Sequence, residues 1–227
     1  MKNLLLLTFL LMSFVGFSQE VSEQDSVTKE TEEQEAEKKV KKWNDRNGPN
    51  NNDDWCFGFG INSVENSGNG INGLTDISNW NFGRPLYLSV EYYINNQFSL
   101  EGTLSLNGFS EGSIIDGATV LKGWDANYVA ADLAIKYSFG DLLNLTSLEP
   151  YLFVGAGNTY IGSYRTEQAP LVENKSVNIF TFNAGIGANY WFSNAWGLNI
   201  NATGKWASAS DYSNHVQASF GVLYSLN

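Results

Sequence analysis

The chain has 227 residues and a net charge of −11, with 24 acidic against 13 basic residues and one cysteine. This balance argues against a nucleic-acid partner, because binding a phosphate backbone requires an excess of lysine and arginine. A single cysteine also excludes an intramolecular disulfide. The 22 glycines, 14% aromatic residues and 16% charged residues favour an all-β fold with strongly curved strands.

The first eighteen residues have the features of a secretory signal peptide. Lys2 supplies the positive charge, and residues 4–17 form an apolar segment. That segment is too short for a spanning helix, which needs about 20 residues. Gly16 and Ser18 are small residues at the −3 and −1 positions of a cleavage site. We therefore expect residues 1–18 to be removed by cleavage between Ser18 and Gln19.

Residues 19–54 form a highly charged segment with hardly any apolar content. Within it, residues 28–43 are predicted to form a helix, because pairs such as Glu35 and Lys39 have the favourable i,i+4 order. We expect a partly helical periplasmic tail. It is either a solvated appendage or a docking segment for a periplasmic or outer-membrane protein partner, and the sequence leaves both open.

Residues 55–227 alternate between apolar and polar side chains in eight segments. A period of two over such lengths predicts β-strands, and about 9–11 residues suffice to cross a bilayer at a tilt. In the fifth segment, Asn158 falls on the apolar face, which we interpret as a bulge or as the edge of the bilayer. The expected strands are 55–63, 84–95, 98–109, 127–139, 151–162, 180–192, 196–206 and 215–226.

The connections between these segments alternate in length. Residues 95–97 and 193–195 form tight turns, and residues 140–149 form an intermediate one. Long loops on one side and short turns on the other are typical of barrels that span an outer membrane. The prediction is a closed, antiparallel, eight-stranded transmembrane β-barrel with its short turns and its N-terminal tail in the periplasm. The long loops are 64–83, 110–126, 163–176 and 207–214.

This pattern resembles the small eight-stranded outer-membrane barrels, such as the OmpA transmembrane domain and the OmpX type. The most specific feature lies in the last strand, where Ser219, Gly221, Tyr224 and Leu226 match the terminal signal for the barrel-assembly machinery. Asn227 departs from that signal, since such barrels usually end on an aromatic residue. The resemblance implies a bacterial outer-membrane location, contact with outer-membrane lipids and insertion by the assembly machinery.

We find no catalytic constellation and expect no cofactor, no metal site and no enzymatic activity. His215 is the one histidine of the chain, which leaves no second imidazole for a metal site. A lipid-modifying barrel enzyme would need His215 together with a serine such as Ser213. The acidic residues of the long loops show no spaced calcium pattern: Asp76, Glu111, Asp116 and Asp125.

The leading hypothesis is a non-enzymatic barrel that serves envelope integrity or adhesion, or acts as an accessory subunit of an outer-membrane complex. A narrow diffusion channel is the alternative, and an outer-membrane lipid-modifying enzyme is a third and less favoured hypothesis. Eight strands leave an interior that side chains just fill, which disfavours a wide pore.

The interior is predicted to contain a charge cluster near the periplasmic side. The tight turn at residues 95–97 sets the register of its flanking strands so that Glu91 lies directly opposite Glu101. Two facing carboxylates repel each other unless a cation joins them. Lys136 on the next strand is the best candidate for this cation, because the alternation of that strand points its side chain into the barrel. We expect Glu91, Glu101 and Lys136 to close the interior as a structural plug.

Overall fold

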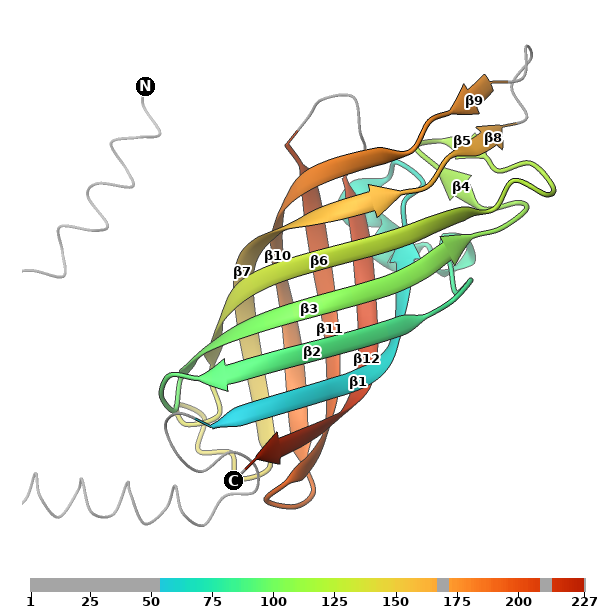
Figure 1. Ribbon diagram of the computed structural model, residues 1–227. Helices are drawn as coiled ribbons and strands as arrows, with labels where there is room; N and C mark the ends of the chain where they lie inside the picture. Colours follow the sequence, from blue (N-terminus) through green and yellow to red (C-terminus); the bar gives the residue numbers. More distant parts are fainter. Residues whose placement is uncertain (1–53, 167–171, 209–213, 227) are drawn as a thin grey trace, which may run out of the picture. The chain divides into compact units, whose positions relative to one another are not determined.

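The computed structural model describes residues 54–166, 172–208 and 214–226. In these residues, eight long antiparallel strands close into a barrel in the order β1-β12-β11-β10-β7-β6-β3-β2 (Figure 1). The predicted all-β fold, a closed eight-stranded antiparallel barrel, is confirmed. The strands are β1 (Trp55–Glu65), β2 (Leu86–Tyr93), β3 (Phe98–Phe109), β6 (Ala126–Ser138), β7 (Leu148–Ile161), β10 (Val177–Trp191), β11 (Trp196–Ala207) and β12 (His215–Leu226).

The barrel closes where the first strand pairs with the last. Trp55 lies opposite Leu226, and the pairing of β1 with β12 continues without interruption to Glu65 and Val216. Halfway along this seam Gly60 faces Gly221. A Cβ at residue 60 would overlap the carbonyl oxygen of Phe220. Glycine therefore permits the close backbone approach that this part of the closure requires.

The two faces of the barrel wall differ in chemistry because successive side chains point to opposite sides of a strand. The outward face is apolar, and Phe59, Leu133 and Val154 leave more than half of their surface exposed. The inward face carries buried asparagine, serine, threonine and charged residues. Such a distribution is the reverse of a soluble protein and fits a wall surrounded by lipid.

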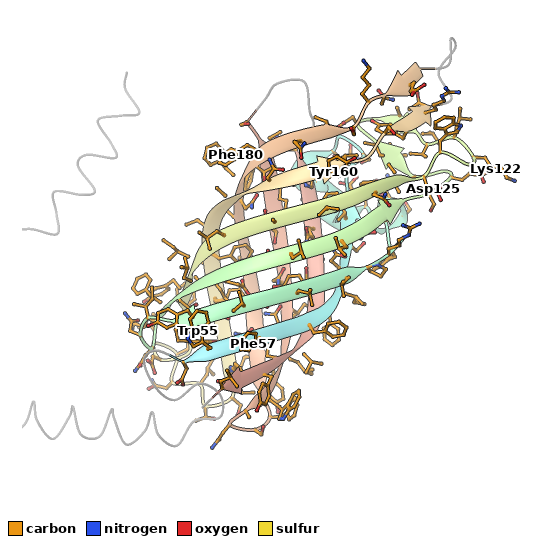
Figure 2. All side chains as sticks on the ribbon, in the orientation of Figure 1. Trp55, Phe57, Lys122, Asp125, Tyr160 and Phe180 are labelled. Atoms are coloured by element: carbon orange, nitrogen blue, oxygen red, sulfur yellow. The ribbon has the colours of Figure 1, made fainter. Side chains whose placement is uncertain are left out.

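Aromatic side chains gather toward both ends of the outward face. Trp55 packs on Tyr92 at 5.0 Å between ring centroids, and Trp196 packs on Tyr224 at 4.8 Å. Figure 2 shows Trp55 near one end of the barrel, and Phe180 toward the other. Both of the tryptophan pairs lie at the short-turn end, and toward the loop end Phe180 packs on Phe182 at 5.3 Å between ring centroids. Amphipathic rings prefer the depth of lipid headgroups, so the aromatic residues at the two ends mark the expected membrane interfaces.

One interpretation made from the sequence is corrected in β7. Asn158 does face outward and is exposed, but β7 pairs without interruption with both β6 and β10, where Asn158 meets Ala131 and Phe180. The bulge is therefore absent. The strand also begins at Leu148, three residues before the expected start, so the preceding connection is shorter than the ten residues predicted.

The ends of the barrel differ in how the chain connects the strands. At the short-turn end β2 runs into β3 and β10 into β11 through tight turns, whereas the loop end carries small ordered elements. Bridges join two of the loops, as Val120 pairs with Thr166. The loop elements are η1 (Gly70–Thr75), η2 (Ile77–Asn79), β4 (Ile114–Ile115), β5 (Ala118–Thr119), β8 (Tyr164–Thr166) and β9 (Val172–Asn174).

The expectations about the N-terminal segment concern residues outside the described part. These are the cleavage site at Ser18 and Gln19 and the helix at 28–43. No helix of the described residues is long and apolar enough to cross a membrane.

Candidate functional site in the barrel interior

The barrel interior holds a charge cluster, which we define as Glu91, Glu101 and Lys136. Glu91 on β2 lies directly opposite Glu101 on β3. Lys136 on β6 lies 2.7 Å from Glu91 Oε2 and 3.5 Å from Glu101 Oε1, measured from Nζ. All three residues are at least 95% buried. The structure thus brings these residues together around one cation.

The lysine reaches the two carboxylates on a diagonal. Lys136 lies across from Ser99, and the residue across from Glu101 is Ala134. The Ser99 hydroxyl donates a hydrogen bond to Glu91 Oε1 at 2.5 Å, so it helps to hold that carboxylate beside the ammonium group. The charge cluster therefore spans three neighbouring strands at slightly different heights in the barrel.

Aromatic side chains complete the surroundings of the charge cluster. The Lys136 ammonium group lies over the ring of Tyr151, 4.1 Å from its centroid. Tyr87 donates a hydrogen bond to Glu101 at 3.4 Å. A cation that is shielded from water gains from both a ring face and charged acceptors. The ammonium group is consequently fixed from several sides.

Glu149 is a third interior carboxylate, which the sequence analysis assigned to a connection. It accepts hydrogen bonds from Asn189 Nδ2 and Trp191 Nε1, both at 3.1 Å, and from Tyr93 at 3.5 Å. The sequence does contain a signal for this position. When the alternation of β7 is continued backwards from Tyr151, the side chain of residue 149 points into the barrel. Pro150 follows this residue directly, and because proline is uncommon inside strands, the sequence does not mark clearly where β7 begins.

A second ion pair crosses the interior toward the loop end. Lys205 on β11 lies 2.5 Å from Asp132 on β6. Asn183 Nδ2 donates to the other oxygen of Asp132 at 2.7 Å. Strands β7 and β10 separate the two charged partners in the sheet order, so the contact runs across the lumen. No local pairing rule predicts such a contact.

The loop end of the interior is closed by apolar packing. Tyr128 belongs to this layer, and its hydroxyl is 3.1 Å from His215 Nε2. His215 is 2% exposed, so the imidazole faces the interior and not the surrounding medium. The layer consists of Val64, Phe109, Ile115, Val120, Ala126, Tyr128, Ala130, Ile161, Tyr164 and Ile179.

Little free volume remains between these layers. A cavity of about 30 Å³ lies between the charge cluster and the second ion pair, bordered by Glu101, Asp132 and Lys205 among others. Such a volume holds roughly two water molecules. The opening beside Glu149 at the short-turn end has no room for water. At both of these places, side chains fill most of the interior.

The four residues of the expected assembly signal lie on β12. Tyr224 and Leu226 face outward and are exposed, whereas Ser219 and Gly221 face inward and are buried. Their arrangement follows from the alternation of the strand. Their role as an assembly signal stays a prediction.

The surroundings of His215 do not favour the hypothesis of a lipid-modifying enzyme. His215 is buried and engaged with Tyr128, which does not suit a base that acts on an external lipid. Ser213 lies outside the described part. Among the described residues, no group of three or more His, Cys, Asp or Glu side chains is placed to hold a metal ion.

The chain is similar to solved structures of outer membrane proteins. OprG from Pseudomonas aeruginosa, an outer membrane protein, is similar at 12% identity and a TM-score of 0.53, covering 78% of this chain and 97% of that chain. The attachment invasion locus protein Ail of Yersinia pestis is similar at 13% identity and a TM-score of 0.46, covering 76% and 97%. At these identities the likeness concerns the fold alone. No curated protein sequence matches the chain.

The family model described as "Outer membrane protein beta-barrel domain" matches residues 49–225. The match spans the whole barrel from β1 to nearly the end of β12. The chain therefore belongs to the outer membrane protein β-barrel domain family, and it is a barrel of the bacterial outer membrane.

Proposed function

We propose that this protein is a non-enzymatic and non-conducting outer-membrane barrel that acts through its surfaces. Its role is then in envelope integrity, in adhesion, or as an accessory subunit of an outer-membrane complex. The observation that carries the proposal is the filled interior, in which two buried ionic layers and one apolar layer succeed each other. A protein without a path or a reactive site inside its wall can act only by what its ends and its outer face contact.

The layers disfavour the alternative of a narrow diffusion channel. A permeating ion would have to pass the charge cluster, then the pair of Asp132 and Lys205, and then the apolar layer. Separating one buried ion pair costs roughly 3–5 kcal/mol. Opening both pairs at once would require a compensating partner for each charge, and the 30 Å³ cavity has no room for several water molecules.

The loop end is the surface best suited to make contacts. Arg165 lies over the ring of Trp124, 4.0 Å from its centroid, and forms an ion pair with Glu173 at 2.8 Å. Phe82 leaves 59% of its surface exposed close to the start of β2. Aromatic and arginine side chains on ordered loops are the residue types that dominate protein contacts. We propose that this end faces outward and that residues 19–54 lie in the periplasm.

Planar-bilayer recording tests the absence of conduction. The refolded wild type is expected to give no current steps above the bare bilayer. The matched variant replaces Glu91, Glu101 and Lys136 by alanine, and it should raise the open probability if the charge cluster is what blocks the path. Regular steps from the wild type would reject the proposal in favour of the channel.

Two experiments in cells address the remaining alternatives. A photo-reactive residue in place of Trp124 should cross-link to an external partner, whereas the same residue in place of the lipid-facing Leu133 should label lipid. Lipid A mass spectra should be identical in wild-type and His215→Ala strains. A mass difference that depends on His215 would favour the enzyme hypothesis.

A further inference from the structure

The loop acids named in the sequence analysis show no calcium pattern by themselves, but the loop that follows β1 has the oxygen spacing of a calcium-binding loop when the count begins at Glu65, the last residue of β1. In the twelve-residue loop of calcium-binding hands, side-chain oxygens occupy positions 1, 3, 5 and 12, and glycine occupies position 6 for a sharp turn. Counting from the last residue of β1 places an oxygen-bearing side chain at each of those four positions and glycine at the sixth. The residues are Glu65, Ser67, Asn69, Asp76 and, at the turn, Gly70.

The backbone of this loop adopts the turn that the pattern requires. Gly70 has a φ of +55°, in the left-handed region that favours glycine, and it begins η1. Ser67 donates to Glu65 Oε1 from its amide at 2.8 Å and also from its hydroxyl. Asn69 Nδ2 donates to the Ser67 hydroxyl at 2.9 Å. The side chains at positions 1, 3 and 5 therefore converge on one another.

Glu65 itself has an unmatched oxygen in a buried place. The residue has outward parity on β1, yet its exposed fraction is 0%. Gly73 of η1 lies so close that a Cβ there would overlap Glu65 Oε2. Nothing in the described part of the chain donates a hydrogen bond to Oε2, and no lysine or arginine there forms an ion pair with Glu65. A buried carboxylate oxygen that accepts no hydrogen bond is energetically unfavourable, because it has lost its contact with water without gaining a donor.

A cation at Oε2 would remove this cost, and the available ligands specify its kind. Carboxylate, hydroxyl, amide and backbone carbonyl oxygens are hard ligands, which suit Ca²⁺ and do not suit metals that prefer sulfur or nitrogen. Asp76 is held in place at the far end of the loop by Ser78 at 2.7 Å and Asn79 at 2.8 Å. Ca²⁺ tolerates irregular coordination, whereas Mg²⁺ demands a near-octahedral shell.

We propose that the loop from Glu65 to Asp76 is a Ca²⁺ site at the loop end of the barrel. Glu65, Ser67, Asn69 and Asp76 provide the side-chain ligands, and the backbone carbonyl at position 7 belongs to Ile71. The acids at positions 1 and 12 are Glu and Asp, the reverse of the usual order. With two acidic ligands the affinity falls in the weak range of about 10⁻⁴–10⁻³ M. Binding would hold η1 against the barrel wall and stabilise the loop end.

Terbium luminescence tests the proposal directly, because Tb³⁺ replaces Ca²⁺ and is excited by a nearby indole. Trp80 is suitably placed, since its Nε1 donates to the carbonyl oxygen of Gly73 at 3.0 Å. The mature chain refolded in detergent micelles should give sensitised Tb³⁺ emission that Ca²⁺ displaces. Trp80→Phe should remove most of the emission while leaving Ca²⁺ binding in calorimetry unchanged.

Two matched variants decide the outcome. Glu65→Gln should weaken Ca²⁺ binding at least tenfold, whereas Glu111→Gln, an exposed acid of another loop, should leave it unchanged. The acids and the tryptophan of residues 19–54 are the same in both, so any emission they contribute is a constant background. Should Glu65→Gln fail to fold, as judged by its gel mobility without heating, Asp76→Asn takes its place with the same expected loss.

Several results would overturn the site. They are no displaceable emission from the wild type, an affinity in Asp76→Asn equal to that of the wild type, and an equal loss in Glu111→Gln. Magnesium competing as well as calcium would also reject the assignment to Ca²⁺.

Discussion

The substitution Lys136→Met tests how the interior is held together. Met replaces the ammonium group by an apolar chain of similar length, so Glu91 and Glu101 remain opposite each other without a cation. Both glutamates are at least 95% buried as residues, and removing one partner of a buried pair costs about 3–5 kcal/mol. A loss of that size is a large fraction of the stability of a typical domain.

Guanidinium unfolding of the micelle-refolded protein measures the effect. The midpoint of Lys136→Met should fall with an unchanged slope, because the surface exposed on unfolding stays the same. The triple variant Lys136→Met, Glu91→Gln, Glu101→Gln should recover most of the loss, since neutral side chains carry no charge to compensate. Ile135→Met on the lipid face is the matched control and should lie within about 0.5 kcal/mol of the wild type.

Two outcomes would refute this reasoning. One is a Lys136→Met variant as stable as Ile135→Met. The other is a triple variant no more stable than Lys136→Met alone, because the repulsion between the carboxylates would then not be the cause of the loss.

Three further predictions concern export, the tail and barrel closure. The protein isolated from outer membranes should begin at Gln19 by mass spectrometry and migrate differently on gels before and after boiling; an intact N-terminus together with unchanged migration would contradict this. Deletion of residues 20–50 should leave membrane insertion intact, because the eight described strands already close the barrel, and loss of the heat-dependent mobility shift would count against it. Gly60→Ala should impair folding because its Cβ would overlap the carbonyl oxygen of Phe220, whereas Gly102→Ala meets only ordinary contact at 3.6 Å and should fold normally; equal yields of folded protein would reject the close-approach argument.

Local features of the chain were enough to predict the barrel. Alternation within each segment assigns an inward and an outward face, and it holds for nearly every strand residue because lipid surrounds one face and packed polar groups the other. A tight turn fixes the register of the two strands that it joins. The pairing of Glu91 with Glu101 therefore follows from the turn at residues 95–97 and from the inward or outward direction of each side chain. The boundaries of β7 escaped this reasoning, since a proline near the start of a strand resembles a loop signal.

Contacts between strands that are not neighbours could be identified only from the tertiary structure. Lys205 and Asp132 share inward parity with many other residues, and only the tilt and closure of the barrel decide that these two meet across the lumen. The same holds for Asn183 and for the apolar layer at the loop end, whose members come from several strands and two loops.

The loop after β1 shows the division between sequence and structure most clearly. From the sequence alone, Glu65 falls in the expected loop 64–83, and the oxygen spacing from Glu65 to Asp76 stands out only once β1 is seen to end at Glu65. The same extension of β1 gives Glu65 a side chain that points away from the barrel interior. The fold of η1 over the wall is what buries that carboxylate and leaves Oε2 without a donor in the described part. The direction of a side chain follows from the alternation of its own strand and can be predicted from that strand's sequence. The burial of the side chain depends on which distant segment packs over it, and the fold of the whole barrel decides which segment that is.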